Sequence, residues 1–360
     1  MTIGVLGAGQ LGRMMALAGY PLGLDFLFLD RDTGTPAHQV APCLFGSFTD
    51  PALLDELARR CNVVTVDWEN VPAAALEHLG TRTRIAPPPA ALAAAQDRAE
   101  EKALFRRLGI PTNRTQVVDS LADLENATRT LGLPGVLKTR RLGYDGKGQA
   151  VLRRAADIPN AWASLGNAPL LYEERIDFDY EVSIIGVRGL DGQIAVYPLN
   201  RNLHRDGILR LTRAPWRAPK VEAAAQRHVR RVLKALDYVG VLAIEFFVVK
   251  GRLLANEMAP RVHNSGHWTI EGAVTSQFEN HLRAICGMPL GATTARGHSA
   301  MLNLIGRMPD TAALLAQPRL HLHDYGKSPR EGRKLGHLTI VETSATAADR
   351  RAAALLRRLR

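Results

Sequence analysis

The first 72 residues alternate between apolar strands and helix-forming segments, and this alternation restricts the fold more than any other feature of the sequence. Residues 2–7 (TIGVLG), 25–30 (DFLFLD) and 62–72 (NVVTVDWENVP) read as strands, and helical spacing occurs in the segments between them, as over 51–60. A β-α-β-α-β order is typical of parallel sheets. We therefore expect a Rossmann-like N-terminal domain.

A glycine-rich turn, GAGQLG at residues 7–12, joins the first strand to a helix, and Asp30 ends the next strand. Backbone N–H groups of a G-x-G-x-x-G turn can bind an anion, and an acid after the second strand holds a ribose hydroxyl in dinucleotide-binding enzymes. On this segment alone three interpretations stay open. They are an NAD site, a turn that only permits close packing and, through Gln10 and Arg13, a site for a nucleotide monophosphate.

The length of 360 residues exceeds the roughly 250–300 residues that one hydrophobic core supports, so we expect several domains. A triple proline at 87–89 marks a boundary, and a helix is expected over about 90–108. Hairpins and helices alternate after it, and a β-rich segment follows from about residue 298. The expected domains are residues 1–90, 91–295 and 296–360.

The charge balance, 46 basic against 35 acidic residues, gives a net charge of +11 and favours anionic partners. No basic run is interleaved with aromatic residues, so we expect no nucleic-acid partner. No apolar stretch reaches the roughly 18 residues of a spanning helix, so we expect no membrane association. Three scattered cysteines without a CxxC pair, and an N-terminus that reads as a strand, predict a cytoplasmic protein without a zinc site.

A lysine and a second glycine-rich turn form the next candidate site. Lys138 ends the apolar strand VLK, and GYDGKG follows at residues 143–148. Three glycines among polar residues give a turn whose backbone can approach phosphates closely. The turn is not a P-loop, because no GxxxxGK[ST] pattern occurs. A solvated lysine and an ordinary hairpin are the alternatives.

Two glutamates on one hairpin form a candidate metal site. Glu245 lies inside the apolar strand VLAIEFFVV, and Asn256 and Glu257 lie on the returning strand. Carboxylate and amide oxygens suit Mg²⁺. A two-residue turn at residues 250–251 would pair 245 with 256, whereas a three-residue loop or a bulge would pair 245 with 257. If both glutamates bind the metal, we expect the longer loop; a glutamate paired with an arginine is the alternative.

The segment APRVHNSGHWT, residues 259–269, follows this hairpin directly. It gathers Arg261, His263, Asn264, Ser265 and His267 in one loop. So many polar groups beside a candidate metal strand indicate a site for an anion or a transition state. Zinc binding by the two histidines is the rival interpretation, but the Ser-Gly pair between them disfavours the helix that their spacing would need.

Two further clusters lie near the C-terminus. His321 and His323 alternate on a probable strand, and we expect them to be structural. The next residues form either a solvated basic loop or a phosphate clamp. This basic cluster consists of Lys327, Arg330, Arg333 and Lys334.

Together the motifs GAGQLGRM, LKTRRLGYDGKGQ, NLHRDGILR, ANEMAPRVHNSGHWT and GRKLGH resemble the N5-carboxyaminoimidazole ribonucleotide synthase family of the ATP-grasp superfamily. The resemblance covers nearly the whole chain. It implies an α/β and α+β protein with a Rossmann-like N-terminal domain, a central ATP-grasp domain and a small β-rich C-terminal domain. The implied activity is that of a carbon–nitrogen ligase in purine biosynthesis.

That reaction joins ATP, bicarbonate and 5-aminoimidazole ribonucleotide. Bicarbonate attacks the γ-phosphate to give carboxyphosphate, and this, or CO₂ released from it, carboxylates the exocyclic amine; the other products are ADP and phosphate. The resemblance also implies Mg²⁺, no NAD, no biotin, no zinc, and a homodimer. Other ATP-grasp ligases, an NAD-dependent dehydrogenase and a non-catalytic basic binding module are the alternatives. The dehydrogenase leaves Glu245, Glu257 and the GYDGKG turn without roles, and the binding module would show salt-sensitive nucleic-acid binding without ATP turnover.

The resemblance assigns roles residue by residue. ATP is assigned to Arg98, Lys138, Gly143, Tyr144, Asp145, Gly146, Lys147, Gly148, Glu173, Glu174, Arg175, Ile176, Glu181, His204, Asn256 and Glu257. The ribonucleotide is assigned to Gln10, Leu11, Tyr144, Asp145, Lys147, Lys327, Arg333 and Lys334. Bicarbonate chemistry is assigned to Asp145, Arg261, His263, Asn264 and His267, and Mg²⁺ to Glu245 and Glu257.

Three departures from the family pattern stand out. Leu142 occupies a position that is glycine in some members, which implies a stiffer entry to the phosphate-binding turn. Lys147 replaces an arginine, which keeps the charge but loses the bidentate fork. Glu174 and Arg175 replace a neutral pair in the expected adenine hinge.

Overall fold

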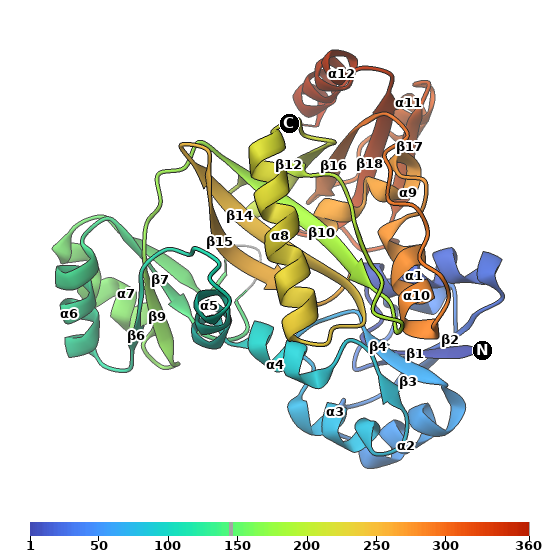
Figure 1. Cartoon of the computed structure of the whole chain (residues 1–360), viewed down its shortest axis with the longest axis horizontal. Helices are drawn as coiled ribbons and strands as arrows, with labels where there is room; N and C mark the ends of the chain where they lie inside the picture. The colour runs from blue at the N-terminus through green and yellow to red at the C-terminus, as the bar shows by residue number, and fades with distance from the viewer. Residues whose placement is uncertain (144–146, 360) are drawn as a thin grey trace.

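The computed structural model describes residues 1–143 and 147–359, and it contains three sheets (Figure 1). Tyr144, Asp145 and Gly146, to which the sequence assigns roles, lie outside the described residues. The four-stranded sheet forms a lobe at one end of the molecule, and the five-stranded N-terminal sheet lies beside the large central sheet.

The N-terminal sheet has the strand order β3-β2-β1-β4-β5, and all its pairs are parallel. Both of its faces are buried, as the continuous apolar runs of its strands require. This confirms the predicted Rossmann-like domain. Its elements are β1 (Thr2–Leu6), α1 (Gln10–Gly19), η1 (Tyr20–Leu22), β2 (Asp25–Asp30), η2 (Pro36–Gln39), β3 (Cys43–Phe45), α2 (Pro51–Arg60), β4 (Val63–Val66), α3 (Ala73–Gly80) and β5 (Arg84–Ile85).

Two helices occupy the segment where one helix was predicted over 90–108. These are α4 (Pro89–Gln96) and α5 (Arg98–Arg107). Asp97 separates them: its backbone is extended, at φ −124° and ψ 114°, and its carboxylate accepts a hydrogen bond from the N–H of Ala99. Asp97 therefore acts as the N-cap of α5 and sets the direction of that helix.

The small lobe is a four-stranded antiparallel sheet of order β6-β9-β7-β8, covered by two helices. It carries Lys138 near the end of β7 and Glu173 on the adjacent β9. Its elements are β6 (Thr115–Val118), α6 (Leu121–Leu131), β7 (Gly135–Thr139), β8 (Gln149–Leu152), η3 (Ala155–Asp157), α7 (Ile158–Leu165) and β9 (Leu170–Glu174).

The large sheet is antiparallel, in the order β15-β14-β10-β12-β13-β16-β18-β17, with β11 paired to β10. Its strands are β10 (Tyr180–Arg188), β11 (Ile194–Val196), β12 (Asn200–Arg205), β13 (Ile208–Ala214), β14 (Gly240–Val249), β15 (Arg252–Ala259), β16 (His298–Ile305), β17 (Leu320–Asp324) and β18 (Lys334–Glu342). The β-rich C-terminal segment thus continues the central sheet, through pairs such as Thr212 with Met301.

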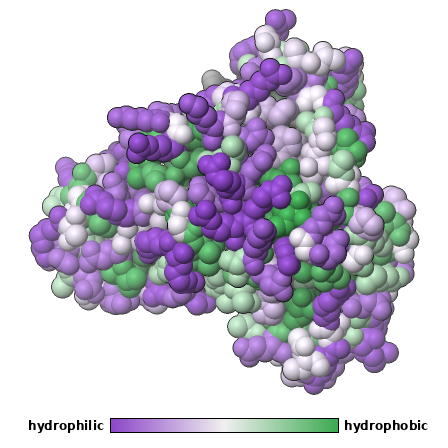
Figure 2. Space-filling view, in the orientation of Figure 1, coloured by the Kyte–Doolittle hydropathy of each residue, from purple (hydrophilic) through white to green (hydrophobic). Residues whose placement is uncertain are grey.

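Helices cover the large sheet and join its strands. The long helix α8 packs along β10, where its apolar stripe is buried (Figure 1). Hydrophilic side chains gather over α8 on its outer side (Figure 2). The helices are α8 (Pro219–Ala235), η4 (Asn264–Gly266), α9 (Thr269–Gly272), α10 (Gln277–Cys286), α11 (Thr311–Leu315) and α12 (Ala345–Arg358). In the described part of the chain, no helix has the length and apolar character needed to span a membrane.

Three β-bulges interrupt the pairing of the large sheet. Each leaves one residue without a partner in the adjacent strand: Arg210 on β13, Asn256 on β15 and Leu335 on β18. A bulge re-aims the side chains around it, and bulges are common beside active sites. All three lie near the polar residues described below.

Candidate active site

The β14–β15 hairpin places its two glutamates directly opposite each other. Lys250 and Gly251 form a two-residue turn, with φ values of 48° and 74°, as a type I′ turn requires. The predicted longer loop is therefore wrong. The bulge at Asn256 instead shifts the register, so that Glu245 pairs with Glu257 and both carboxylates share one face.

The oxygens on this hairpin suit a hard cation. The Oδ1 atom of Asn256 is buried and has no hydrogen-bond partner in the structure. Burial raises the pKa of Glu245 to about 7; His204 opposes this rise, and the carboxylates of Glu257 and Glu181 add to it. Two carboxylates and one amide oxygen match Mg²⁺, which takes few protein ligands alongside water and phosphate oxygens.

Two lysines converge on one buried carboxylate from the small lobe. The Nζ atom of Lys138 lies 2.7 Å from Oε2 of Glu173, and the buried Lys102 lies 4.0 Å from Oε1. Lys102 also donates hydrogen bonds to the carbonyl oxygens of Ala255 (3.1 Å) and Asn256 (2.7 Å). Burial opposes ionisation of Glu173, but both lysines hold its pKa well below the usual range.

Sequence reasoning missed two buried charges of α5, those of Glu101 and Lys102. Lys102 is fully buried, and Glu101, 2% exposed, accepts a hydrogen bond from the N–H of Met258 at 2.6 Å. Burial and the charge of Glu257 raise the pKa of Glu101 to about 8. The helix sequence contains a sign of these buried charges. Arg98, Glu101 and Lys102 lie on the same helix face as the apolar Phe105.

Arg98 joins this helix to the metal hairpin. Its Nη1 atom lies 3.0 Å from Oε2 of Glu257, and its Nη2 atom lies 3.5 Å from the carbonyl oxygen of Gly143. Burial raises the pKa of Glu257, but Arg98 and Lys138 outweigh it and lower that pKa to about 2. Arg98 thus lies between the hairpin and Gly143, where the glycine-rich turn begins.

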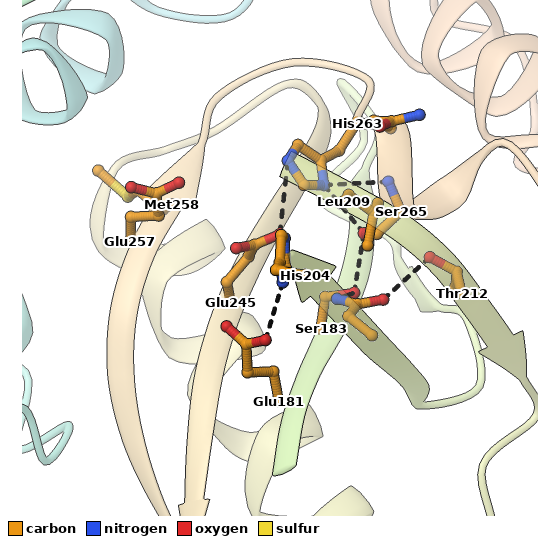
Figure 3. A network of polar contacts seen from close by, with 12 residues as sticks. Glu181, Ser183, His204, Leu209, Thr212, Glu245, Glu257, Met258, His263 and Ser265 are labelled. Carbon is orange, nitrogen blue, oxygen red and sulfur yellow. Dashed lines mark hydrogen bonds and ion pairs between the residues drawn. The ribbon is translucent and has the colours of Figure 1, made fainter. Parts of the chain in front are cut away.

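His204 and Glu181 face the hairpin from neighbouring strands (Figure 3). The Nδ1 atom of His204 lies 2.9 Å from Oε2 of Glu181. Burial lowers the pKa of His204, but the hydrogen bond to Glu181 and the charges of Glu245 and Glu257 outweigh it and raise the pKa to about 9. At neutral pH a cationic imidazole therefore lies beside the side chains of Glu181, Glu245 and Glu257.

The loop after β15 carries Arg261 and His263 to the same face. Arg261 donates from Nε to the carboxylate of Glu69, a residue of the N-terminal domain that sequence reasoning did not single out. The Nε2 atom of His263 lies 3.8 Å from Oε1 of Glu245, and its Nδ1 atom lies 2.9 Å from Oγ of Ser265 (Figure 3). Burial and Arg261 lower the pKa of His263 to about 3, so its imidazole is neutral.

His267 is buried under the 259–269 loop and does not line the cavity that His263 and Asn264 line. It is 1% exposed and packs against His337, with ring centroids 4.8 Å apart. His337 stacks on His323 at 4.4 Å, and His323 contacts Glu271 at 2.6 Å. His267 therefore supports the loop from below, and His323 has the structural role that was expected. Among the described residues no cluster of three or more His, Cys, Asp or Glu side chains could hold a metal ion.

A cavity of about 690 Å³ gathers most of the residues assigned to the ribonucleotide and to bicarbonate. It draws them from all three parts of the chain, and the Nζ atom of Lys327 donates to the side-chain oxygen of Gln10 across it. The predicted residues on its wall are Gln10, Leu11, Arg98, Gly143, Lys147, Glu257, Arg261, His263, Asn264, Lys327, Arg333 and Lys334. We call this space the substrate cavity.

The residues assigned to the adenine hinge divide into two groups. Glu173 points inward to Lys138, whereas Glu174 pairs with Arg114 at 2.8 Å at the edge of the small lobe. Arg175 and Ile176 follow directly after the end of β9. This places the charged pair Glu174-Arg175 in the connection between the small lobe and the large sheet.

The N-terminal glycine turn bonds to carboxylates of the protein itself. Asp67 accepts hydrogen bonds from the N–H groups of Gly9 and Gly12, the latter at 3.1 Å, and Asp30 accepts one from Ala8 at 2.6 Å. Burial raises the pKa of Asp67 to about 6, although the bond from Gly9 opposes this. Asp30, at the end of β2, was a candidate ribose ligand in the sequence, but in the structure its carboxylate bonds to the glycine turn.

Comparison with known proteins covers most of the chain. Family models match residues 1–96 (ribonucleotide synthetase preATP-grasp domain), 103–278 (ATP-grasp domain) and 299–351 (phosphoribosylaminoimidazole carboxylase C-terminal domain). The chain is 51% identical over 340 residues to the N5-carboxyaminoimidazole ribonucleotide synthase of Pseudomonas aeruginosa, an alignment that covers 94% of each chain.

Solved structures agree with this assignment. The N5-carboxyaminoimidazole ribonucleotide synthetase of Thermus thermophilus is 50% identical, with a TM-score of 0.95 over 99% of this chain and 98% of the other. The N5-carboxyaminoimidazole synthase of Aspergillus clavatus, in complex with ADP and 5-aminoimidazole ribonucleotide, is 32% identical, with a TM-score of 0.93 over 99% and 98%. The chain therefore belongs to the N5-carboxyaminoimidazole ribonucleotide synthase family of ATP-grasp enzymes.

Proposed function

We propose that this protein carboxylates 5-aminoimidazole ribonucleotide at its exocyclic amine, with ATP and bicarbonate as co-substrates, in purine biosynthesis. The substrate cavity is the observation that carries the proposal. It joins Gln10 of the N-terminal domain, Arg261 and His263 of the central loop, and Lys327 and Arg333 of the C-terminal segment beside Glu257. A phosphorylated ribonucleotide at these cations would present its amine next to the hairpin.

The reaction has two steps. A bicarbonate oxygen attacks the γ-phosphorus of ATP, the bond to ADP breaks, and carboxyphosphate forms. The amine then attacks the carbonyl carbon of carboxyphosphate, phosphate leaves, and the nitrogen loses a proton. Both steps concentrate negative charge, so fixed cations and positioning supply most of the catalysis. Arg98, Lys138 and Arg261 are the cations that we assign to this task.

Mg²⁺ fits the oxygens of the hairpin. We assign Glu245 and Glu257 as its carboxylate ligands and Asn256, whose side-chain oxygen is buried without a partner, as a neighbouring donor. When bound, the ion would neutralise phosphate charge and align the transferring group. The remaining work falls to side chains: Lys138 binds a phosphate oxygen, and His204 with Glu181 lies beside the ribose.

Arg261 is the residue that we assign to the bicarbonate and carboxyphosphate anions. Glu69 orients its guanidinium, and most of the Arg261 side chain is buried in the cavity wall. His263 is neutral, so it contributes hydrogen bonds and not charge. Carboxyphosphate hydrolyses readily in water, so a site that excludes water from it would favour transfer to the amine.

The direct test of the mechanism uses isotopes. With ¹³C- and ¹⁸O-labelled bicarbonate, the product should carry ¹³C on the exocyclic nitrogen, and the released phosphate should carry one ¹⁸O atom. NMR and mass spectrometry measure both. Phosphate without ¹⁸O would contradict attack of bicarbonate on ATP, and unlabelled ribonucleotide would contradict carboxylation.

We also propose a cytoplasmic homodimer, on the resemblance to the family. Sedimentation velocity at micromolar concentration should give a single species of about twice the 39.3 kDa chain mass. A monomer under these conditions would contradict the dimer but leave the chemistry intact.

A further inference from the structure

A second cavity, larger than the substrate cavity, lies behind the β12–β13 hairpin. Its volume is about 1110 Å³, and it is enclosed by the hairpin, the end of β16 with the loop that follows, and the end of α12. Small-molecule sites in proteins occupy roughly 300–1,000 Å³, so an organic ligand would fit. The proposed reaction assigns no role to this space, which we call the rear cavity.

Arginines dominate the polar wall of the rear cavity. Arg205, Arg210, Arg307 and Arg358 line it, against the two acids Asp206 and Asp310. The carboxylate of Asp310 is engaged as the N-cap of α11, where it accepts from the N–H groups of Ala312 and Ala313. Asp206 is largely exposed and lies 4.0 Å from Arg205, a contact of little energy. The wall therefore carries a net positive charge.

Arg210 is the most informative of these residues. It is the bulged residue of β13: Leu203 pairs with Leu211 and His204 with Leu209, so Arg210 faces no partner. Its Nε atom is buried and makes no hydrogen bond.

Six other arginines, whose side chains are at most 28% exposed, pair with carboxylates: Arg98, Arg140, Arg188, Arg213, Arg261 and Arg351. Arg13 is like Arg210, because its Nε atom is also buried without a hydrogen-bond partner. A partly buried guanidinium without an anion is costly, and a bound anion would remove that cost.

The rest of the wall is apolar. Leu304, Ile305, Met308, Leu356 and Leu359 lie between the arginines. A ligand that matches both parts has an anionic group and a flat or aliphatic body. A phosphomonoester of a nucleoside has this chemistry, because its phosphate accepts the bidentate arginine fork and its base packs on apolar side chains.

The rear cavity is joined to the active site through two of its own lining residues. His204 lines it and hydrogen-bonds Glu181 on the nucleotide side. Asn303 lines it and exchanges two hydrogen bonds with Asn264 of the 259–269 loop, at 2.7 and 3.0 Å. A ligand that moves either residue would alter the position of a group in the active site.

We propose that the rear cavity is a second binding site, for a nucleoside monophosphate, and that it is distinct from the sites for ATP and the ribonucleotide substrate. Arg210 and Arg358 bind the phosphate, and the apolar residues of β16 and α12 hold the base. Occupancy changes ATP turnover through His204 and Asn303. The binding part of this proposal stands whether or not the proposed carboxylation is correct.

The test is calorimetric titration of AMP into the full-length protein saturated with Mg·ADP, so that AMP cannot enter the ATP site. We expect one AMP to bind per chain. Arg210→Gln and Arg358→Gln should each weaken this binding at least tenfold, and neither should change basal ATP turnover more than twofold. Arg358 is exposed, so its variant retains the fold if Arg210→Gln does not.

Two control variants separate this site from its alternatives. Arg227→Gln removes the same charge from the exposed face of α8, and Lys327→Ala disables the substrate cavity. Both should bind AMP like the parent protein. Three outcomes would overturn the proposal. The first is that AMP does not bind in the presence of Mg·ADP, and the second is that Arg210→Gln and Arg358→Gln bind AMP as well as Arg227→Gln does. The third outcome is a loss of AMP binding in Lys327→Ala alone.

Discussion

The glycine turn after β1 and the glutamate hairpin of β14 and β15 both read in the sequence as ligand sites, but the structure treats them differently. In the turn, Asp67 and Asp30 accept the free backbone N–H groups, so the anion position is filled from within the protein. In the hairpin, the amide oxygen of Asn256 has no partner and Glu245 faces Glu257. A motif predicts local geometry, whereas unsatisfied polar groups indicate where a ligand is needed.

This comparison predicts that hairpin carboxylates control turnover and turn residues control stability. The largest effect should come from Glu257→Gln, which keeps the shape of the side chain but removes a charge opposite Glu245. We expect ATP turnover to fall at least 100-fold with little change in melting temperature, because charge neutralisation of the phosphates depends on this position.

Steady-state ADP release, measured beside a melting curve, checks that expectation. Glu331→Gln, on the exposed rim of the same cavity, is the charge-matched control and should stay within a few-fold of the parent protein. Near-normal turnover in a folded Glu257→Gln variant would remove this residue from the metal site.

Asp67 should make the stability of the protein fall as pH rises from about 4 to about 6. Its pKa is about 6 in the folded protein and 3.8 in the reference state, so the folded state binds the proton more tightly. Below pH 3.8 Asp67 is protonated in both states and costs no stability. Above pH 6 it is ionised in both states, and the free energy of unfolding is lower by up to about 3 kcal/mol. Urea unfolding at several pH values, compared with Asp67→Asn, measures it. Identical pH profiles for the two proteins would show that Asp67 does not titrate in this range.

Gly9→Ala should destabilise the glycine turn by roughly 1–3 kcal/mol, because the added methyl group has no room. Its Cβ would lie 2.5 Å from Oδ2 of Asp67 and would displace the carboxylate from the backbone N–H groups. Gly80→Ala is the matched control, since its Cβ meets only Ile85 at 3.6 Å. Equal unfolding free energies for the two variants would argue that the bond between Asp67 and the turn contributes little.

The smallest expected effect concerns the entry to the glycine-rich turn in the small lobe. Leu142 has a φ of 62°, a left-handed conformation that costs a non-glycine residue about 1–2 kcal/mol, and its side chain is 65% exposed. Glycine relieves this strain but loses more entropy on folding. Leu142→Gly should therefore change the unfolding free energy by less than about 1 kcal/mol. A loss of 2 kcal/mol or more in chemical denaturation would mean that the leucine side chain itself holds the turn.

The strand pattern was enough to predict the parallel N-terminal sheet, and the family resemblance named several of the residues that line the substrate cavity. Register was harder to predict: the sequence allows a loop or a bulge at the hairpin, and the strand pairing in the structure has the bulge at Asn256. The resemblance assigned His267 to the surroundings of bicarbonate, but its ring is buried against His337, which stacks on His323.

Lys102 and Glu69 were missed for a related reason. Each gains its role from a partner distant in sequence: Lys102 from the carbonyl oxygens of β15, and Glu69 from Arg261. Local pattern cannot show such partners. A charged residue on the buried face of a helix, as in α5, is the one local sign that a buried pair is present.

Release of ADP from Mg·ATP, measured with and without 5-aminoimidazole ribonucleotide and with and without bicarbonate, tests the central claim most directly. The account predicts turnover that requires both co-substrates and that falls with Glu257→Gln. If the protein binds ATP but its rate of ADP release does not depend on the ribonucleotide and bicarbonate, the central claim is contradicted.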